Sequence, residues 1–243
     1  MNYELPTTNS NGFSLTEVLL AVGILAVGML FIAGTFLVGI HFSTIATEQT
    51  IAAVASDEAF AKIKIYGVNL NDPNWLVGNL RPFEAVKLNP ISPDEFAYPS
   101  TNTVAEKQYY WSALCRRVAP DPNRLVQVTV FVCRKVGPVS ARPVPVKVNV
   151  QRSISNNSEL VITDGNEALI NDRYTIVDNN TGWIYRVLER YADNPSTPIR
   201  EDQIILLDRP WVGGATGLVW VVPPPFGGGR HPCIAVYQTE MRF

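Results

Sequence analysis

Apolar residues are distributed unevenly along the 243-residue chain. Between Glu17 and Glu48, thirty consecutive residues include no Asp, Glu, Lys or Arg, and the 23 residues of Val18–Ile40 are almost all apolar or glycine. A helix needs about 20 mostly apolar residues to cross the roughly 30 Å hydrocarbon core of a bilayer. The sequence therefore predicts one membrane-spanning helix near its start, at about 18–40, and no other segment meets this length.

A cleaved secretory signal is the competing interpretation of this segment. Such a signal has a basic start, an apolar stretch of about 7–15 residues and a small-residue cleavage site. Residues 1–12 contain no Lys or Arg, and the apolar stretch is too long, so a retained anchor is favoured. The first side-chain cation is Lys62, so the positive-inside bias that sets orientation is missing.

The helical pattern continues beyond the apolar segment. After Ile40, apolar positions recur among charged ones at helical spacing as far as Tyr66. Gly67 is predicted to end the helix, with Pro73 beyond it. The sequence thus predicts a continuous helix over 13–66, whose second half is amphipathic and forms the spine of a soluble head.

Alternation with a period of two begins after residue 107. Gln108–Val118 and Arg124–Lys135 flank a proline-containing turn, and Val144–Arg152 is a third run, with prolines that favour an edge strand. The second run places valines on one face at Val126, Val128, Val130 and Val132. Residues 67–152 therefore predict a head of three antiparallel strands, whose valine face the second half of the helix covers.

Short strands separated by turns follow a predicted linker at 153–158. They are predicted at Glu159–Thr163, Arg173–Asp178, Trp183–Arg190, Gln203–Asp208 and Leu218–Val222. Their spacing resembles a small β-barrel of the SH3-like kind over 159–222. Its expected core is Ile162, Tyr174, Ile176, Ile184, Val187, Ile205 and Leu207. After a second linker at 223–229, the segment 230–243 holds a further strand (233–241), which either returns to the first sheet or closes the second module. The predicted fold class is α+β.

The composition limits the available chemistry. Hydrophobic residues make up 47% and charged residues 17%, below the roughly 25% usual for soluble chains, which excludes a wholly disordered chain. The net charge of -2 provides no basic excess for a phosphate backbone, so direct nucleic-acid binding is not expected. No nucleophile elbow, phosphate-binding loop or zinc-protease motif occurs, so we expect neither an enzyme nor a bound cofactor or metal.

The cysteines leave two interpretations open. Cys115 and Cys133 lie on neighbouring predicted strands, so a disulfide is possible in an oxidising compartment. Buried free thiols are the alternative. With Cys233 the count is odd, and the pairing stays undetermined.

Three further patterns have ordinary structural interpretations beside functional ones. Asp164-Gly165-Asn166-Glu167 has the oxygen ligands of a calcium loop, but an Asx turn is favoured. His41 and His231 have no third ligand nearby in the sequence. The aromatic residues of the barrel segment are expected in its core rather than in a ligand groove: Trp183, Tyr185, Trp211, Trp220 and Phe226.

The residues that lead into the apolar helix form a more specific motif than any of the patterns above. They read Gly12-Phe13-Ser14-Leu15-Thr16-Glu17 and resemble the processing and assembly motif of type IV pilins and type II secretion pseudopilins. The resemblance covers about residues 9–45. It implies that residues 1–12 are a leader, that prepilin peptidase cleaves after Gly12, and that the new amino-terminal Phe13 is N-methylated. This leader lacks the basic residue usual in the family, and the membrane segment lacks the proline common in major pilins.

The resemblance also implies a function. The chain would be a minor pilin or a pseudopilin, a structural subunit of a type IV pilus-like or type II secretion filament. It would cross the bacterial inner membrane once, with its head outside the cytoplasm, before it enters the filament. Its partners would be prepilin peptidase, other pilin or pseudopilin subunits and membrane lipid. The alternative is an inner-membrane-anchored β-domain binding protein that does not polymerise.

Glu17 is the expected assembly residue. A carboxylate within a membrane costs roughly 2.5–3.5 kcal/mol on insertion scales, so it is rarely there without a partner. Cleavage after Gly12 creates an α-amino group on Phe13, four positions before Glu17, and such a group has a pKa of about 7.7–8. This ammonium can pair with Glu17 of its own helix or of a neighbouring subunit, which would set the axial register of a filament.

Overall fold

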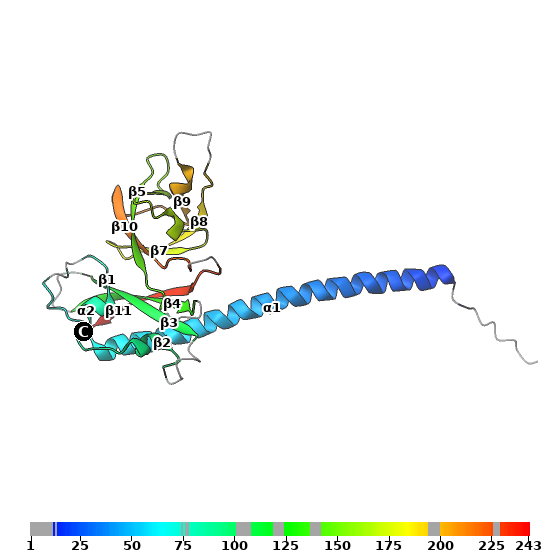
Figure 1. Cartoon of the computed structure of the whole chain (residues 1–243), viewed down its shortest axis with the longest axis horizontal. Coiled ribbons are helices and arrows are strands. Elements are labelled where there is room, and N and C mark those ends of the chain that lie inside the picture. Colours follow the sequence, from blue (N-terminus) through cyan, green and yellow to red (C-terminus); the bar gives the residue numbers. More distant parts are fainter. Residues whose placement is uncertain are drawn as a thin grey trace, which may run out of the picture. The chain divides into compact units, whose positions relative to one another are not determined.

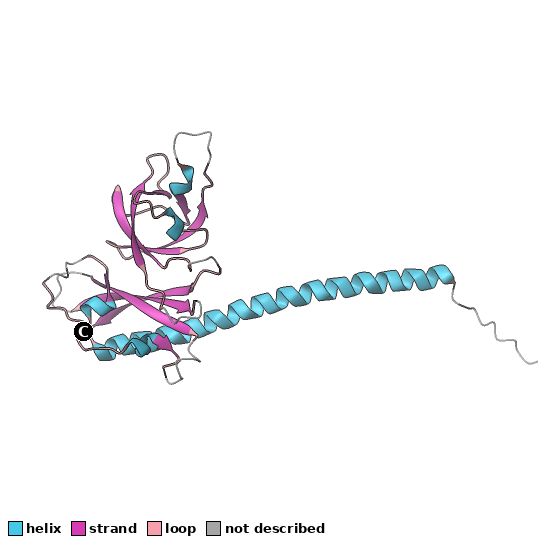
Figure 2. Cartoon of the chain, in the orientation of Figure 1, coloured by secondary structure: helices cyan, strands magenta, loops and turns pink. Residues whose placement is uncertain are grey.

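The computed structural model describes residues 12, 14–73, 75, 78–100, 108–118, 124–136, 142–193, 200–225 and 229–243. It contains a long helix, an antiparallel sheet and a closed antiparallel β-barrel (Figures 1 and 2). The predicted α+β class, with a long N-terminal helix packed on a sheet and an additional small barrel, is confirmed. The chain divides into two compact units, Met1–Glu48 and Gln49–Phe243, which are described separately.

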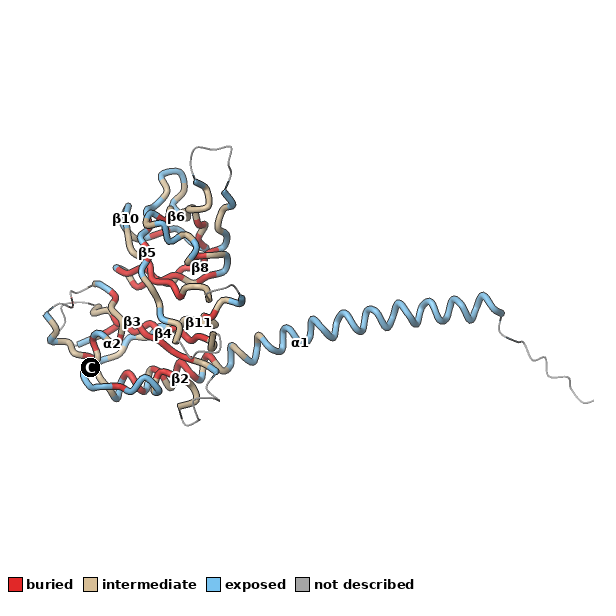
Figure 3. Tube along the Cα trace, in the orientation of Figure 1, coloured by how far each residue is buried: buried red, intermediate tan, exposed pale blue. Residues whose placement is uncertain are grey.

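Helix α1 spans Leu15–Tyr66 and supplies residues to both units. In the first unit its large apolar side chains, from Leu15 to Phe42, are 48–78% exposed (Figure 3). Among the described residues, α1 is the one helix long and apolar enough to cross a membrane, judged by length and composition. The helix ends at Tyr66 because Gly67 adopts a positive φ of 71°, as glycines after helix ends commonly do.

The sheet of the second unit has strands in the order β1-β3-β4-β11, and β2 also pairs with β3. All of these pairs are antiparallel. The strands are β1 (Arg81–Pro82), β2 (Ala97–Tyr98), β3 (Tyr109–Arg117), β4 (Leu125–Arg134) and β11 (Cys233–Arg242). Between them lie the short helix α2 (Phe83–Val86) and the 3-10 helix η1 (Pro93–Phe96). The C-terminal strand therefore returns to the first sheet, which decides between the two alternatives.

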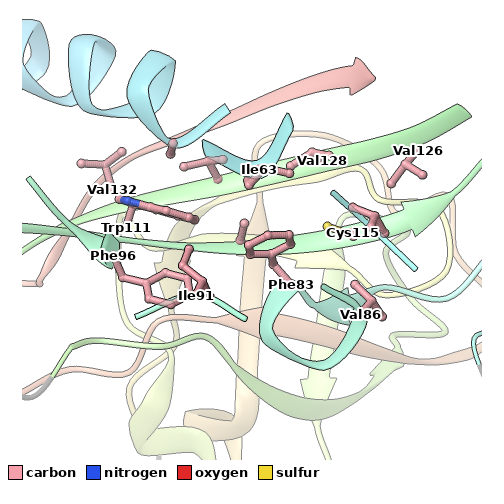
Figure 4. Packing of buried hydrophobic residues seen from close by; sticks show 14 of the residues in the cluster. Ile63, Phe83, Val86, Ile91, Phe96, Trp111, Cys115, Val126, Val128 and Val132 are labelled. Carbon is pink, nitrogen blue, oxygen red and sulfur yellow. The ribbon is translucent and has the colours of Figure 1, made fainter. Parts of the chain in front are cut away.

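The second half of α1 covers the valine face of β4, as predicted. Ala52, Ala55, Ala59 and Ile63 are fully buried in one cluster. The same cluster holds the four valines of β4, together with Trp111 of β3 and Phe83 (Figure 4). Small helix side chains allow the helix axis to approach the sheet closely, while the valines fill the space between them. This apolar layer forms the core of the head around the helix.

The assignment of 144–152 to that sheet is wrong. Strand β5 (Val146–Arg152) pairs with β6 (Glu159–Ile162) and with β10 (Thr216–Val221), and it belongs to the barrel. Its inward valines, Val148 and Val150, lie in the barrel core. Alternation marks a strand with one buried face, but it does not identify the partner that covers the face. Residues 153–158 accordingly connect two paired barrel strands.

The barrel closes in the order β10-β5-β6-β9-β8-β7. Its remaining elements are β7 (Thr175–Asp178), β8 (Ile184–Arg190), β9 (Ile204–Leu207), η2 (Glu167–Leu169) and η3 (Glu201–Gln203). Six of the seven predicted core residues lie in its buried cluster: Ile162, Tyr174, Ile176, Val187, Ile205 and Leu207. Ile184 is the exception, because it packs against a different cluster, at the sheet.

The face of the sheet opposite α1 contacts the barrel. Phe131 and Cys133 of β4 are buried in a cluster with Val177 and Trp220 of the barrel. The β7–β8 turn adds a polar contact to the sheet, because the Leu80 amide donates to the Asn179 carbonyl oxygen at 2.9 Å and Arg116 Nη1 donates to the Asn180 carbonyl oxygen at 2.9 Å. The sheet is thus covered by an apolar helix face on one side and by a mixed apolar and polar contact on the other.

Candidate functional site

Ser14 caps helix α1 at the position where the motif meets the apolar segment. The Glu17 amide donates to the Ser14 carbonyl oxygen at 3.0 Å and to Ser14 Oγ at 3.3 Å. Ser14 Oγ also lies 2.5 Å from Thr16 Oγ1. A serine cap followed three residues later by glutamate is the sequence pattern of a capping box. Ser14 was not predicted as a helix cap, although its Ser-x-x-Glu spacing with Glu17 is the sequence signal for one.

Glu17 lies in the first turn of α1 and is exposed. Its negative charge is favourable there, because a helix N-terminus carries partial positive charge. Among the described residues, the Glu17 carboxylate has no ion-pair partner. Gly12 is exposed as well, while Phe13 lies outside the described residues. The pairing of Glu17 with the Phe13 amine therefore stays a prediction.

Hydroxyl side chains within the apolar half of α1 bond to the helix itself. Thr35 Oγ1 donates to the Ile32 carbonyl oxygen at 2.9 Å, and Thr44 Oγ1 donates to the Ile40 carbonyl oxygen at 2.9 Å. An unsatisfied polar group in hydrocarbon costs several kcal/mol, on the order of a lost hydrogen bond or more. These internal bonds make both threonines compatible with a lipid environment.

The second half of α1 contains a buried cation, Lys62, whose position was not predicted from the sequence. Lys62 Nζ lies 2.8 Å from Glu58 Oε1 and 2.9 Å from Glu95 Oε2, and it donates to the Glu95 carbonyl oxygen at 2.7 Å. Trp111 Nε1 donates to the same carbonyl oxygen at 3.0 Å. The i,i+4 spacing of Glu58 and Lys62 was visible in the sequence, but Glu95 comes from a distant segment. The cluster fixes η1 against the helix and presents no open site.

The cysteines separate onto the two faces of the sheet. Cys115 is buried in the cluster that faces α1, where burial and then the charge of Glu84 raise its thiol pKa (Figure 4). Cys133 is buried on the opposite face, and Cys233 is partly buried beside it. All three are free thiols in the structure. Cys115 pairs across strands with Val128, so a Cys115–Cys133 disulfide does not fit this register.

The remaining candidate sites have structural roles in the described residues. Asp164 Oδ1 accepts from the Asn166 amide at 3.2 Å and forms an Asx turn, while Asp164 Oδ2 accepts from the Asn149 amide at 2.8 Å. Burial lowers the pKa of His231, although hydrogen bonds to the Val222 and Cys233 carbonyl oxygens oppose this. No group of three His, Cys, Asp or Glu residues suited to a metal occurs in the described part of the chain.

The aromatic residues of the barrel segment divide between core and surface. Tyr185 and Trp211 are buried in the barrel, and Trp220 is buried at the sheet. Trp183 is 47% exposed, with the Arg209 guanidinium 5.9 Å from its ring centroid. Phe226 lies outside the described residues. The expectation of barrel-core positions is therefore wrong for Trp183, which is exposed, and for Trp220, which is buried in the cluster at the sheet instead.

Comparison with known protein families identifies the N-terminal segment. Residues 7–33 match the family described as the prokaryotic N-terminal methylation motif. The matched range contains Gly12, Phe13, Glu17 and the first turns of α1. No curated protein and no solved structure matches the chain. The protein thus carries a prepilin-type methylation motif, typical of type IV pilins and pseudopilins, at the start of its long apolar helix.

Proposed function

We propose that this protein is a structural subunit of a type IV pilus-like or type II secretion filament, processed by prepilin peptidase and assembled through its N-terminal helix. The observation that carries the proposal is the position of the motif. It stands on a helix whose large apolar side chains are exposed from Leu15 to Phe42, and the same helix forms the core of the head from Ala52 onward. Prepilin-type proteins are typically structural and not enzymes.

The proposed cleavage site agrees with the local geometry of the helix start. Gly12 is exposed and precedes the Ser14 cap, so cleavage after Gly12 removes no residue of α1. The capping pair of Ser14 and Glu17 stays in the mature chain and continues to satisfy an amide of the first turn. The leader is therefore dispensable for the helix, and methylation of Phe13 modifies a residue directly next to the cap.

Before assembly, the apolar half of α1 anchors the subunit in the inner membrane, with the head outside the cytoplasm. After assembly, the same surface packs against the helices of neighbouring subunits. A shallow surface groove of α1, lined by Ile32, Thr35, Phe36, Gly39, Ile40 and Ser43, supports such packing. Gly39 leaves open space where a larger residue would project, and small residues allow close helix approach.

Glu17 acts in assembly in this proposal. The Glu17 carboxylate has no ion-pair partner among the described residues of its own chain, and a Phe13 ammonium of a neighbouring subunit would supply one. The two charges would then satisfy each other in an apolar filament core. Removing one partner of a buried pair typically costs about 3–5 kcal/mol, because the other charge stays desolvated without compensation.

The first experiment is mass spectrometry of the full chain extracted from membranes of a host with prepilin peptidase. We expect a mature N-terminus at methylated Phe13. A bulky residue in place of Gly12 should block processing, while Gly12→Ala keeps the residue small and serves as the matched control. A chain that retains residues 9–11 in the peptidase-containing host would contradict the proposed processing.

The second experiment separates anchoring from assembly. Glu17→Leu should be processed and inserted as well as the parent chain, yet be recovered poorly with sheared filaments or pilin partners. Glu17→Asp, which keeps the charge but shortens its reach, should be intermediate. Equal recovery of Glu17→Leu and the parent chain would remove the assembly role. Normal insertion without any recovery of the parent chain in filaments would favour a membrane-anchored binding protein instead.

A further inference from the structure

Cys133 and Cys233 face each other across strands β4 and β11. They are Cα partners in the antiparallel register, although 100 positions separate them in the sequence. The Arg134 amide donates to the Pro232 carbonyl oxygen at 2.8 Å. A bond between these flanking residues identifies Cys133 and Cys233 as a non-hydrogen-bonded pair, the type in which opposite Cα atoms lie only about 4.5 Å apart. That spacing lies within the range that a disulfide spans.

Both cysteine side chains lie on the same face of the sheet. Cys133 is buried in the cluster that holds Phe131 and Trp220, and Cys233 packs against this cluster while it is partly buried. Hydrogen bonding between the two side chains raises the pKa of the Cys133 thiol, and burial raises it further. The third cysteine, Cys115, lies in the cluster on the helix-facing side of the sheet and competes for neither thiol.

We propose that Cys133 and Cys233 form a disulfide that fastens the C-terminal strand to the sheet when the head folds in oxidising surroundings. The Cys233 thiolate, on the more accessible residue, attacks one sulfur of a small disulfide such as oxidised glutathione and releases one thiol. The Cys133 thiolate then attacks Cys233 Sγ and releases the second thiol. Two electrons pass from the cysteine pair to the oxidant, whose two released thiolates take up the two protons.

The bridge would add a covalent link at the end of β11 where the strand pairing is irregular. At the far end of this strand, Lys64 Nζ donates to the Arg242 carbonyl oxygen at 2.8 Å, and the Phe243 amide donates to the Arg124 carbonyl oxygen at 3.2 Å. At the near end, a register shift lies between Cys233 and Ala235. A bond from Cys133 to Cys233 closes a loop that contains the whole barrel. The proposal does not depend on the proposed filament function.

The test uses the full chain in detergent, unfolded in guanidinium and refolded with reduced and oxidised glutathione. Trypsin places the three cysteines on separate peptides, at 108–116, 125–134 and 231–242. Free thiols are alkylated before digestion, and linked peptides are identified by mass spectrometry. We expect 125–134 joined to 231–242, with Cys115 alkylated. A bridge that includes 108–116, or three alkylated thiols in refolded protein, would overturn the proposal.

Two variants and one stability measurement complete the test. Cys115→Ser should keep the bridge, whereas Cys233→Ala should abolish it. The same chain refolded in dithiothreitol is the reference for correct refolding. Because the closed loop is long, the thermal midpoint of the oxidised chain should lie roughly 10 °C above that of the reduced chain. The difference should vanish in Cys233→Ala; a difference of the same size in that variant would assign the effect to another cause.

Discussion

The two halves of helix α1 share one secondary structure but are built for different surroundings. From Leu15 to Phe42 the helix presents large, exposed Leu, Ile, Val and Phe side chains. From Ala52 to Ile63 its buried apolar positions are mainly alanine, packed on the valines of β4. Large side chains maximise apolar area toward lipid or a neighbouring helix, whereas small ones allow a close approach to a sheet. The comparison shows that side-chain size, as well as hydrophobicity, separates an anchor from a spine.

The largest expected effect comes from matched isoleucines in the two halves. Ile63 is fully buried, while Ile32 is 70% exposed. Ile63→Ala should lower the free energy of unfolding of the head by about 2–5 kcal/mol, because it removes buried methyl groups and leaves a cavity. Ile32→Ala should leave the head unchanged. Denaturant unfolding of both full-length variants in detergent, followed by tryptophan fluorescence, measures the difference. Equal losses of unfolding free energy in the two variants would contradict the distinction between the anchor half and the spine half of the helix.

A matched pair of charged residues gives the next effect. Lys62→Met leaves the Glu58 and Glu95 carboxylates without their shared cation, and we expect a loss of about 1–3 kcal/mol because both carboxylates are only partly exposed. Glu17→Gln removes a charge that has no ion-pair partner among the described residues, so the stability of the head should not change. The same unfolding assay applies. A destabilised head in Glu17→Gln would show that the two halves are coupled.

A substitution at the contact between sheet and barrel can show whether the second half of α1, the sheet and the barrel unfold together. Gly182 has a positive φ of 73°, and a Cβ there would clash with Gln127 Oε1. Gly182→Ala should therefore cost about 1–2 kcal/mol through backbone strain and displacement of Gln127. We expect one unfolding transition for the whole head, with its midpoint shifted in the same direction as in Ile63→Ala. A separate unfolding transition of the barrel, with the transition of the sheet unchanged, would show that the second half of α1 unfolds cooperatively with the sheet but not with the barrel.

The smallest effect is expected at the start of the first half. Ser14→Ala removes the side-chain acceptor of the Glu17 amide and should cost about 1 kcal/mol, confined to the first turn. Hydrogen exchange at the Glu17 amide should become about fivefold faster, while the head amides keep their rates. Ser14→Thr retains the hydroxyl and should restore protection. Unchanged exchange in Ser14→Ala would mean that the cap contributes nothing measurable.

Local patterns predicted the elements of the fold more reliably than their partners. The helix, the valine face of β4 and most of the barrel core were evident from periodicity, because each pattern reports which side of an element is buried. The same reasoning placed 144–152 in the wrong sheet, since the valines of β5 bury equally well in a barrel. Ile184 was assigned to the wrong cluster because it lies where barrel and sheet meet.

Three features follow from the sequence alone: the motif from Gly12 to Glu17, the apolar anchor that follows it, and the change to an amphipathic helix beyond the anchor. These are properties of residues close together in the chain, where spacing translates directly into geometry. Three pairings became evident only in the folded chain: β11 returns to β4, β5 completes the barrel, and Cys133 lies opposite Cys233 and not Cys115. Such pairings join segments up to 100 positions apart, and they depend on which complementary faces can be buried together, a competition that no local pattern records.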